Sequence, residues 1–108
     1  MLRDEHMETL VTHMDAATHV TELHLRNNQI SDAGLAALCK ASAPSLEYIS
    51  LSSNRVGDEG AKALTAALAA GAWPRMRQIY IGGNAIGGDA RKALKAAAQA
   101  RDVTLPYL

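Results

Sequence analysis

One line of residues occurs three times in this chain of 108 residues. It holds two apolar residues with one residue between them, an asparagine three residues later, and another apolar residue two positions beyond. The copies span residues 23–30, 49–56 and 79–86, with asparagines at positions 28, 54 and 84, a spacing of 26 and then 30 residues. A period of this size indicates that each copy is one structural unit stacked on the next.

Each position of the repeat has a physical interpretation. The alternating apolar pair predicts a short strand with one inward face, and strands of neighbouring units are expected to pair in parallel. Asn28, Asn54 and Asn84 follow the strands, and we expect their amides to form a ladder between adjacent turns. Alanine-rich segments follow, such as 33–38 and 61–68, and predict a helix in every unit.

The two ends of the stack have their own patterns. Residues 3–15 carry apolar side chains at helical spacing and predict an amphipathic helix. This helix either caps the first strand or corresponds to the helix of a missing preceding repeat. At the other end, residues 103–105 repeat the strand alternation, and we expect Thr104 to align with Tyr80. Pro106 then ends the strand, because proline lacks a backbone donor.

The line L-x-x-L-x-L-x-x-N-x-I, with a helix in each unit, resembles leucine-rich repeats of the ribonuclease-inhibitor type. The resemblance covers residues 20 to about 105. It implies an α/β fold, a short right-handed solenoid of about three β-turn-α units, with a parallel sheet on the concave side and helices on the convex side. We expect a single domain over 1–108, divided into an N-terminal capping helix (1–19), repeats at 20–45, 46–75 and 76–100, and a terminal edge strand (101–108).

Composition limits the classes of partner and compartment. Lys and Arg number 11, as do Asp and Glu, so no net field attracts nucleic acid or an anionic membrane. No apolar run is long enough to predict a membrane span. The single cysteine, Cys39, excludes an internal disulfide and is interpreted as a partly buried helical residue. We therefore expect an intracellular, reducing compartment, with the cytoplasm first and an organellar assembly as the alternative.

Catalytic and metal-binding patterns are weak. The glycine-rich stretch 82–88 lies between a strand and a helix, but Asp89 stands where a phosphate-binding loop needs lysine. The four histidines lack the spacing of a zinc site, and we expect them to be solvated or at an interface. His24 and Ser50 occupy equivalent strand positions, yet they lack the remaining parts of a hydrolase site. The sequence predicts neither an enzyme nor a cofactor or metal site.

The inner, concave face of the predicted strand layer is the candidate binding surface, because its residues are not needed for the core. Tyr48 and Tyr80 project from it, and tyrosine within a polar rim is typical of protein interfaces. The competing interpretation is an ordinary solvated sheet face with cross-strand packing. The candidate partner-binding residues are Glu22, His24, Arg26, Tyr48, Ser50, Ser52, Gln78 and Tyr80.

These observations favour a non-enzymatic protein-interaction module, foremost a small scaffold subunit of a larger assembly. It would bind one or more protein partners through the concave sheet face and the exposed stack ends. One alternative is regulation of an enzyme, because the resemblance extends to ribonuclease inhibitors and to the activating protein of a small GTPase. Another is a fragment of a longer receptor-like protein with the same repeats. Both rest on fold analogy.

Overall fold

The computed structural model describes residues 2–16, 19–106 and 108. Helices and short strands alternate along the chain. In order they are α1 (Asp4–Ala16), β1 (Glu22–His24), α2 (Asp32–Leu38), β2 (Tyr48–Ser50), α3 (Asp58–Ala69), β3 (Gln78–Tyr80) and α4 (Gly88–Ala100). Each copy of the repeated line thus coincides with one strand and is followed by one helix, as the repeat predicts.

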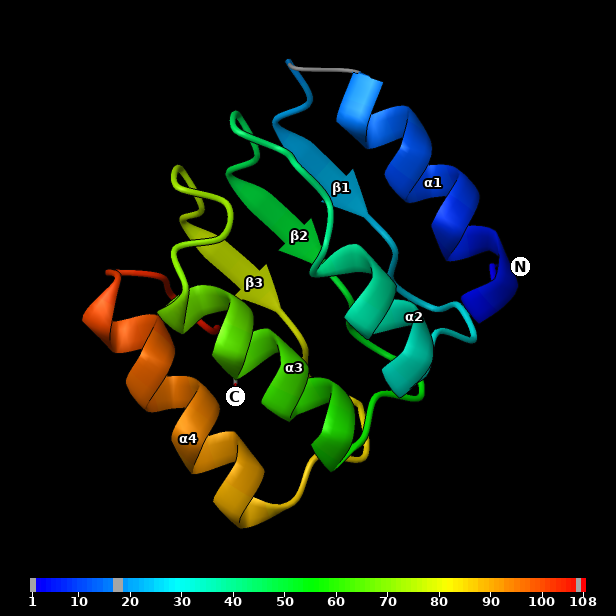
Figure 1. Cartoon of the computed structure of the whole chain (residues 1–108). Helices are drawn as coiled ribbons and strands as arrows, with labels where there is room; N and C mark the ends of the chain where they lie inside the picture. The colour runs from blue at the N-terminus through cyan, green and yellow to red at the C-terminus, as the bar shows by residue number, and fades with distance from the viewer. Residues whose placement is uncertain (1, 17–18, 107) are drawn as a thin grey trace.

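The three strands form one parallel sheet in the order β1-β2-β3. Leu23 pairs with Ile49, and Ile49 pairs with Ile79, so equivalent repeat positions lie side by side. The four helices form a second layer along one face of this sheet (Figure 1). The parallel sheet and the helix in each unit are confirmed.

The core fills the space between the two layers. Ile49 and Ile79 of the strands and Leu64 and Leu94 of the helices are completely buried. Trp73, in the connection before β3, is only 2% exposed and contributes the largest side chain to the core. Burial of these side chains is the main stabilising contribution in a stack whose strands have three residues each.

The asparagine side chains connect the turns of adjacent units. Asn54 donates from Nδ2 to the carbonyls of Leu25 (2.8 Å) and Leu51 (3.0 Å), and its Oδ1 accepts the Ile30 amide (3.0 Å). Asn84 repeats this arrangement one unit later, donating to the Leu51 carbonyl at 3.0 Å. Backbone groups that the turns leave unpaired are satisfied in this way by the next unit.

Aspartates at the helix starts form a second set of contacts between units. Asp32 accepts the backbone amide of Gly57 at 2.6 Å, and Asp58 accepts that of Gly87 at 2.6 Å. Gly57 and Gly87 are the N-cap residues of the following helices, and neither has a side-chain cap. Helices α3 and α4 are therefore each capped by the carboxylate of the preceding unit.

The N-terminal segment makes the same contacts with the first repeat that the first repeat makes with the second. Leu2 donates its amide to Asn28 Oδ1 (2.8 Å) and accepts the amide of Gln29 (2.8 Å). Ile30 has the same two contacts with the following unit. Asp4 accepts the Ser31 amide (2.7 Å), as Asp32 does for Gly57. Helix α1 is therefore equivalent in its contacts to a repeat helix.

The C-terminal segment pairs with β3 in a different register from the expected one. Thr104 forms a parallel bridge with Gln78, two residues before the expected partner Tyr80. A shift of two residues keeps the same side chains on each face, so alternation alone does not distinguish the two registers. Arg101 fixes the segment before this bridge by donating to the carbonyls of Ala72 and Trp73.

Candidate binding face

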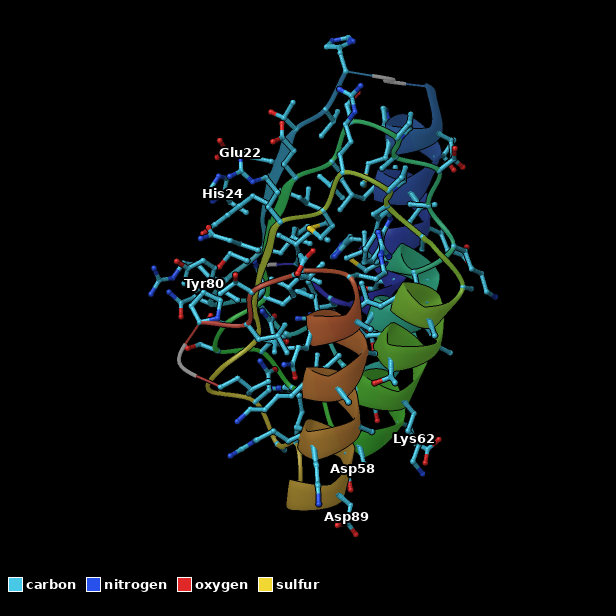
Figure 2. All side chains as sticks on the ribbon, turned by 90° about the vertical axis from the view of Figure 1, so that its left-hand side faces the viewer. Glu22, His24, Asp58, Lys62, Tyr80 and Asp89 are labelled. Carbon is cyan, nitrogen blue, oxygen red and sulfur yellow. The ribbon has the colours of Figure 1, made fainter. Side chains whose placement is uncertain are left out.

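The candidate binding face is the side of the sheet that points away from the helices. Figure 2 shows Glu22, His24 and Tyr80 on that side, whereas Lys62 of α3 lies on the opposite side of the molecule. The alternation of short strands explains this placement, since Leu23, Ile49 and Ile79 take the inward position between them. The repeat thus positions the residues before and after each central apolar residue on one surface.

A row of three rings crosses this face. The ring centroids of His24 and Tyr48 are 4.9 Å apart, and those of Tyr48 and Tyr80 are 5.4 Å apart. Both pairs are tilted, an arrangement that aromatic rings favour. Glu22 Oε1 lies 2.9 Å from His24 Nε2 and orients the imidazole at one end of the row. The strands therefore hold these rings in fixed positions.

The remaining predicted residues differ in their accessibility. Glu22, His24, Arg26 and Gln78 are exposed, and the two tyrosines are half-buried. Ser52 is also half-buried. Ser50 differs from the expected exposed position, because only 3% of its surface is accessible. Its strand register places it opposite His24 and Tyr80, whose larger side chains surround a small one. The face therefore presents the rings and not the Ser50 hydroxyl.

A hollow of about 420 Å³ lies next to the row, at the start of the strands. Its polar lining includes Tyr48 and Gln78, together with charged residues that precede the strands. Among these, Glu47 and Arg77 lie within 3.8 Å of each other. The repeat pattern does not single out these two residues, although both occupy the position directly before a strand. The full lining is Thr21, Glu22, Glu47, Tyr48, Arg77, Gln78, Asp102 and Thr104.

Three observations concern the candidate chemical groups of the chain. Among the residues that the structure describes, no three histidine, cysteine or acidic side chains are grouped to hold a metal ion. The amide of Gly87, in the glycine-rich stretch, donates to Asp58 at 2.6 Å, so a carboxylate occupies the place that a phosphate would need. Burial raises the pKa of the Cys39 thiol to about 12, which keeps it protonated and weakly nucleophilic.

Comparison with known proteins supports the class that this architecture defines. A family model described as "Leucine Rich repeat" matches residues 16–39 and 42–64. These two matches cover the first unit up to the end of its helix and most of the second unit, and they support a leucine-rich repeat protein. Domains of this class generally mediate contacts between proteins. A search of curated proteins found no match to the chain. None of the described helices is long and apolar enough to cross a membrane.

Proposed function

We propose that this chain is a non-enzymatic module that binds a protein partner through the sheet face. The observation that carries the proposal is the ring row of His24, Tyr48 and Tyr80, with centroid distances of 4.9 and 5.4 Å. Tyrosine offers a large apolar surface and a hydroxyl, with few rotatable bonds to immobilise on binding. The row is therefore suited to anchor a partner.

The charges around the row complete a typical interface pattern. Glu22 in β1 and Arg26 just after it carry opposite charges, and so do Glu47 and Arg77 on the rim of the hollow. A partner that covers the rings displaces water from their centre, while these exposed groups remain at the edge. Such rim charges orient the partner and contribute less to affinity than the rings do.

We further infer that the units belong to the ribonuclease-inhibitor type of repeat, because α3 and α4 have 12 and 13 residues. Helices are broader than the strand spacing, so a helix in each unit favours a stack with the sheet on its concave side. A right-handed stack is favoured because crossovers between parallel strands of one sheet are almost always right-handed. The proposed repeats at 20–45, 46–75 and 76–100 each contain one strand and one helix. A role as a small scaffold subunit in a reducing intracellular compartment fits this short stack and its single cysteine.

The proposal is tested with the double variant Tyr48→Ala/Tyr80→Ala. The tagged chain is used to capture partners from a native extract of the source cells, and bound proteins are quantified by mass spectrometry. Loss of both rings is expected to reduce the specific partner at least tenfold, since each anchor contributes about 2 kcal/mol or more. The variant must retain the helical circular dichroism of the parent chain.

The matched control is Lys62→Ala/Glu59→Ala on helix α3. Both side chains are exposed and form an ion pair on the other side of the molecule (3.1 Å). Because surface pairs contribute little to stability, this variant is expected to fold and to keep the partner. Retention of the partner by the tyrosine variant, or its loss from the control, would place the interface away from the sheet face.

A further inference from the structure

The hollow at the start of the strands and the ring row have one residue in common, Tyr48. Its half-buried ring stands between His24 and Tyr80 in the row and also forms part of the wall of the hollow. A partner that covers the row therefore reaches the hollow as well, whose volume of about 420 Å³ can admit a long side chain. The chemistry of that side chain depends on the function proposed above, because it belongs to the same partner.

The hollow carries more negative than positive charge. Its lining includes the carboxylates of Glu22, Glu47 and Asp102 but only one guanidinium, that of Arg77. Arg77 is 78% exposed and lies 3.8 Å from Glu47, a distance longer than a direct hydrogen bond. Glu22 is engaged by His24 through Oε1 alone. No ion pair within the described part of the chain involves Asp102. An incoming cation would meet charge that the chain itself leaves uncompensated.

The opposite end of the sheet face has the reverse charge. The segments that join each strand to its helix, 25–31, 51–57 and 81–87, contain no acidic residue. They hold two arginines, Arg26 and Arg55, and both are exposed. Arg26 lies two residues after His24 and therefore extends the same face. The face is thus negative where the strands start and positive where they end, and this polarity selects partners by charge and direction.

The fold itself does not require a carboxylate at Asp102. This residue follows Arg101, the C-cap of α4, and has a φ of +55°. Gly71 takes the same place after α3, with a φ of +86°. Glycine and asparagine suit this conformation, and a negative charge is unfavourable at the C-terminus of a helix. Asp102 therefore adds charge to the hollow at a cost to the local structure.

We propose that the hollow receives a basic side chain of the protein partner, with arginine favoured over lysine. Glu47 and Asp102 line the hollow together with the ring of Tyr48. A guanidinium has five donors in one plane, so it can bind carboxylates along its edges while a face lies against an aromatic ring. An acidic side chain is repelled from the same place, and a neutral one gains no attraction there.

The first test is an NMR titration of the isotope-labelled chain with the blocked peptide Gly-Arg-Gly at pH 7 and low salt. We expect saturable shifts of the amide signals of Tyr48, Gln78 and Thr104, which line the hollow, and weaker binding at high salt. The neutral peptide Gly-Gln-Gly should bind about fivefold more weakly, the effect of two exposed ion pairs. Equal binding of the two peptides, shifts confined to other surfaces, or no binding of either overturns the proposal.

The charges of the hollow are tested with Glu47→Gln/Asp102→Asn. Both changes keep the size of the side chain, and asparagine tolerates a positive φ, so the variant is expected to fold. It should bind the arginine peptide about fivefold more weakly than the parent chain does. The matched control, Glu59→Gln/Asp89→Asn, neutralises the same two residue types at exposed positions of α3 and α4, away from the sheet face (Figure 2). Undiminished binding by the first variant, or an equal loss in the control, contradicts the proposal.

A third variant, Arg77→Gln, removes the cation that the hollow already contains. It frees Glu47 and should raise the affinity for the arginine peptide about twofold, whereas a lower affinity counts against the proposal. The two proposals fail separately. If a captured partner is lost from Tyr48→Ala/Tyr80→Ala but binds Glu47→Gln/Asp102→Asn as well as the parent chain, the interface stands and the basic side chain is refuted.

Discussion

Replacement of Asn54 by alanine tests whether amide contacts between units stabilise the stack. Asn54 is 9% exposed, and its side chain forms hydrogen bonds to three backbone carbonyls and accepts one from a backbone amide. Two of these carbonyls keep other asparagines as donors, since Asn28 reaches Leu25 at 3.0 Å and Asn84 reaches Leu51 at 3.0 Å. The Ile30 amide has no second acceptor among the described residues.

The magnitude follows from these contacts. A buried amide without a partner costs about 1–3 kcal/mol, whereas the three carbonyls together add about 1 kcal/mol, because each of them keeps another donor. The expected loss is therefore about 2–4 kcal/mol in the free energy of unfolding, or roughly 8–32 °C in Tm for a domain of this size. The same change at Asn28 frees the amide of Leu2, which is half-exposed and accessible to water. We expect a loss of about 1 kcal/mol there.

Urea unfolding followed by circular dichroism measures both variants against the parent chain. The two substitutions remove the same atoms, so the difference between them isolates the effect of burial in the middle of the stack. If the two variants lose free energies of unfolding that agree within about 0.5 kcal/mol, the reasoning is refuted. Such agreement would mean that water or the neighbouring asparagines replace the contacts of Asn54 as well as those of Asn28.

Three other variants test single contacts. Gly60→Ala should lower stability by about 1–3 kcal/mol in thermal unfolding, because its Cβ would lie 2.6 Å from Asp32 Oδ1 and 2.8 Å from Val56 Cγ1. Arg101→Ala should cost about 2 kcal/mol, and lysine should not rescue it, since one ammonium cannot reach the carbonyls of Ala72 and Trp73 together. The Cys39 thiol has a pKa raised from 9.0 to about 12 by burial, so its contribution to stability is complete below pH 9 and disappears as the pH rises toward 12. Cys39→Ala should remove that part of the pH dependence, and iodoacetamide at pH 8 should modify the native thiol far more slowly than the unfolded one.

The repeat line was sufficient to predict the order of strand, turn and helix and the parallel sheet. The reason is that the apolar residues occupy the same repeat positions in all three copies. Parallel pairing of the strands then places the equivalent residues Leu23, Ile49 and Ile79 side by side. Local propensity would not have identified strands of three residues, because their hydrogen bonds go to other units.

Other features depend on how units lie against one another, which the pattern does not specify. The contact from Asp32 to Gly57 requires the stagger between successive helices. The burial of Ser50 follows from the larger side chains opposite it. Thr104 pairs two residues away from the expected position, since a shift of two preserves the alternation. The partner role of the sheet face stays a prediction.

The aspartate contacts run in one direction only and stop at Gly88. Asp4, Asp32 and Asp58 each supply a carboxylate to the unit that follows, whereas glycine stands at the corresponding place in the last unit, two residues after Ile86. An engineer who lengthens this protein should therefore duplicate an internal unit, where donors and acceptors are already matched. A unit appended after the last helix would begin without the carboxylate that caps the others, unless Gly88→Asp accompanied it.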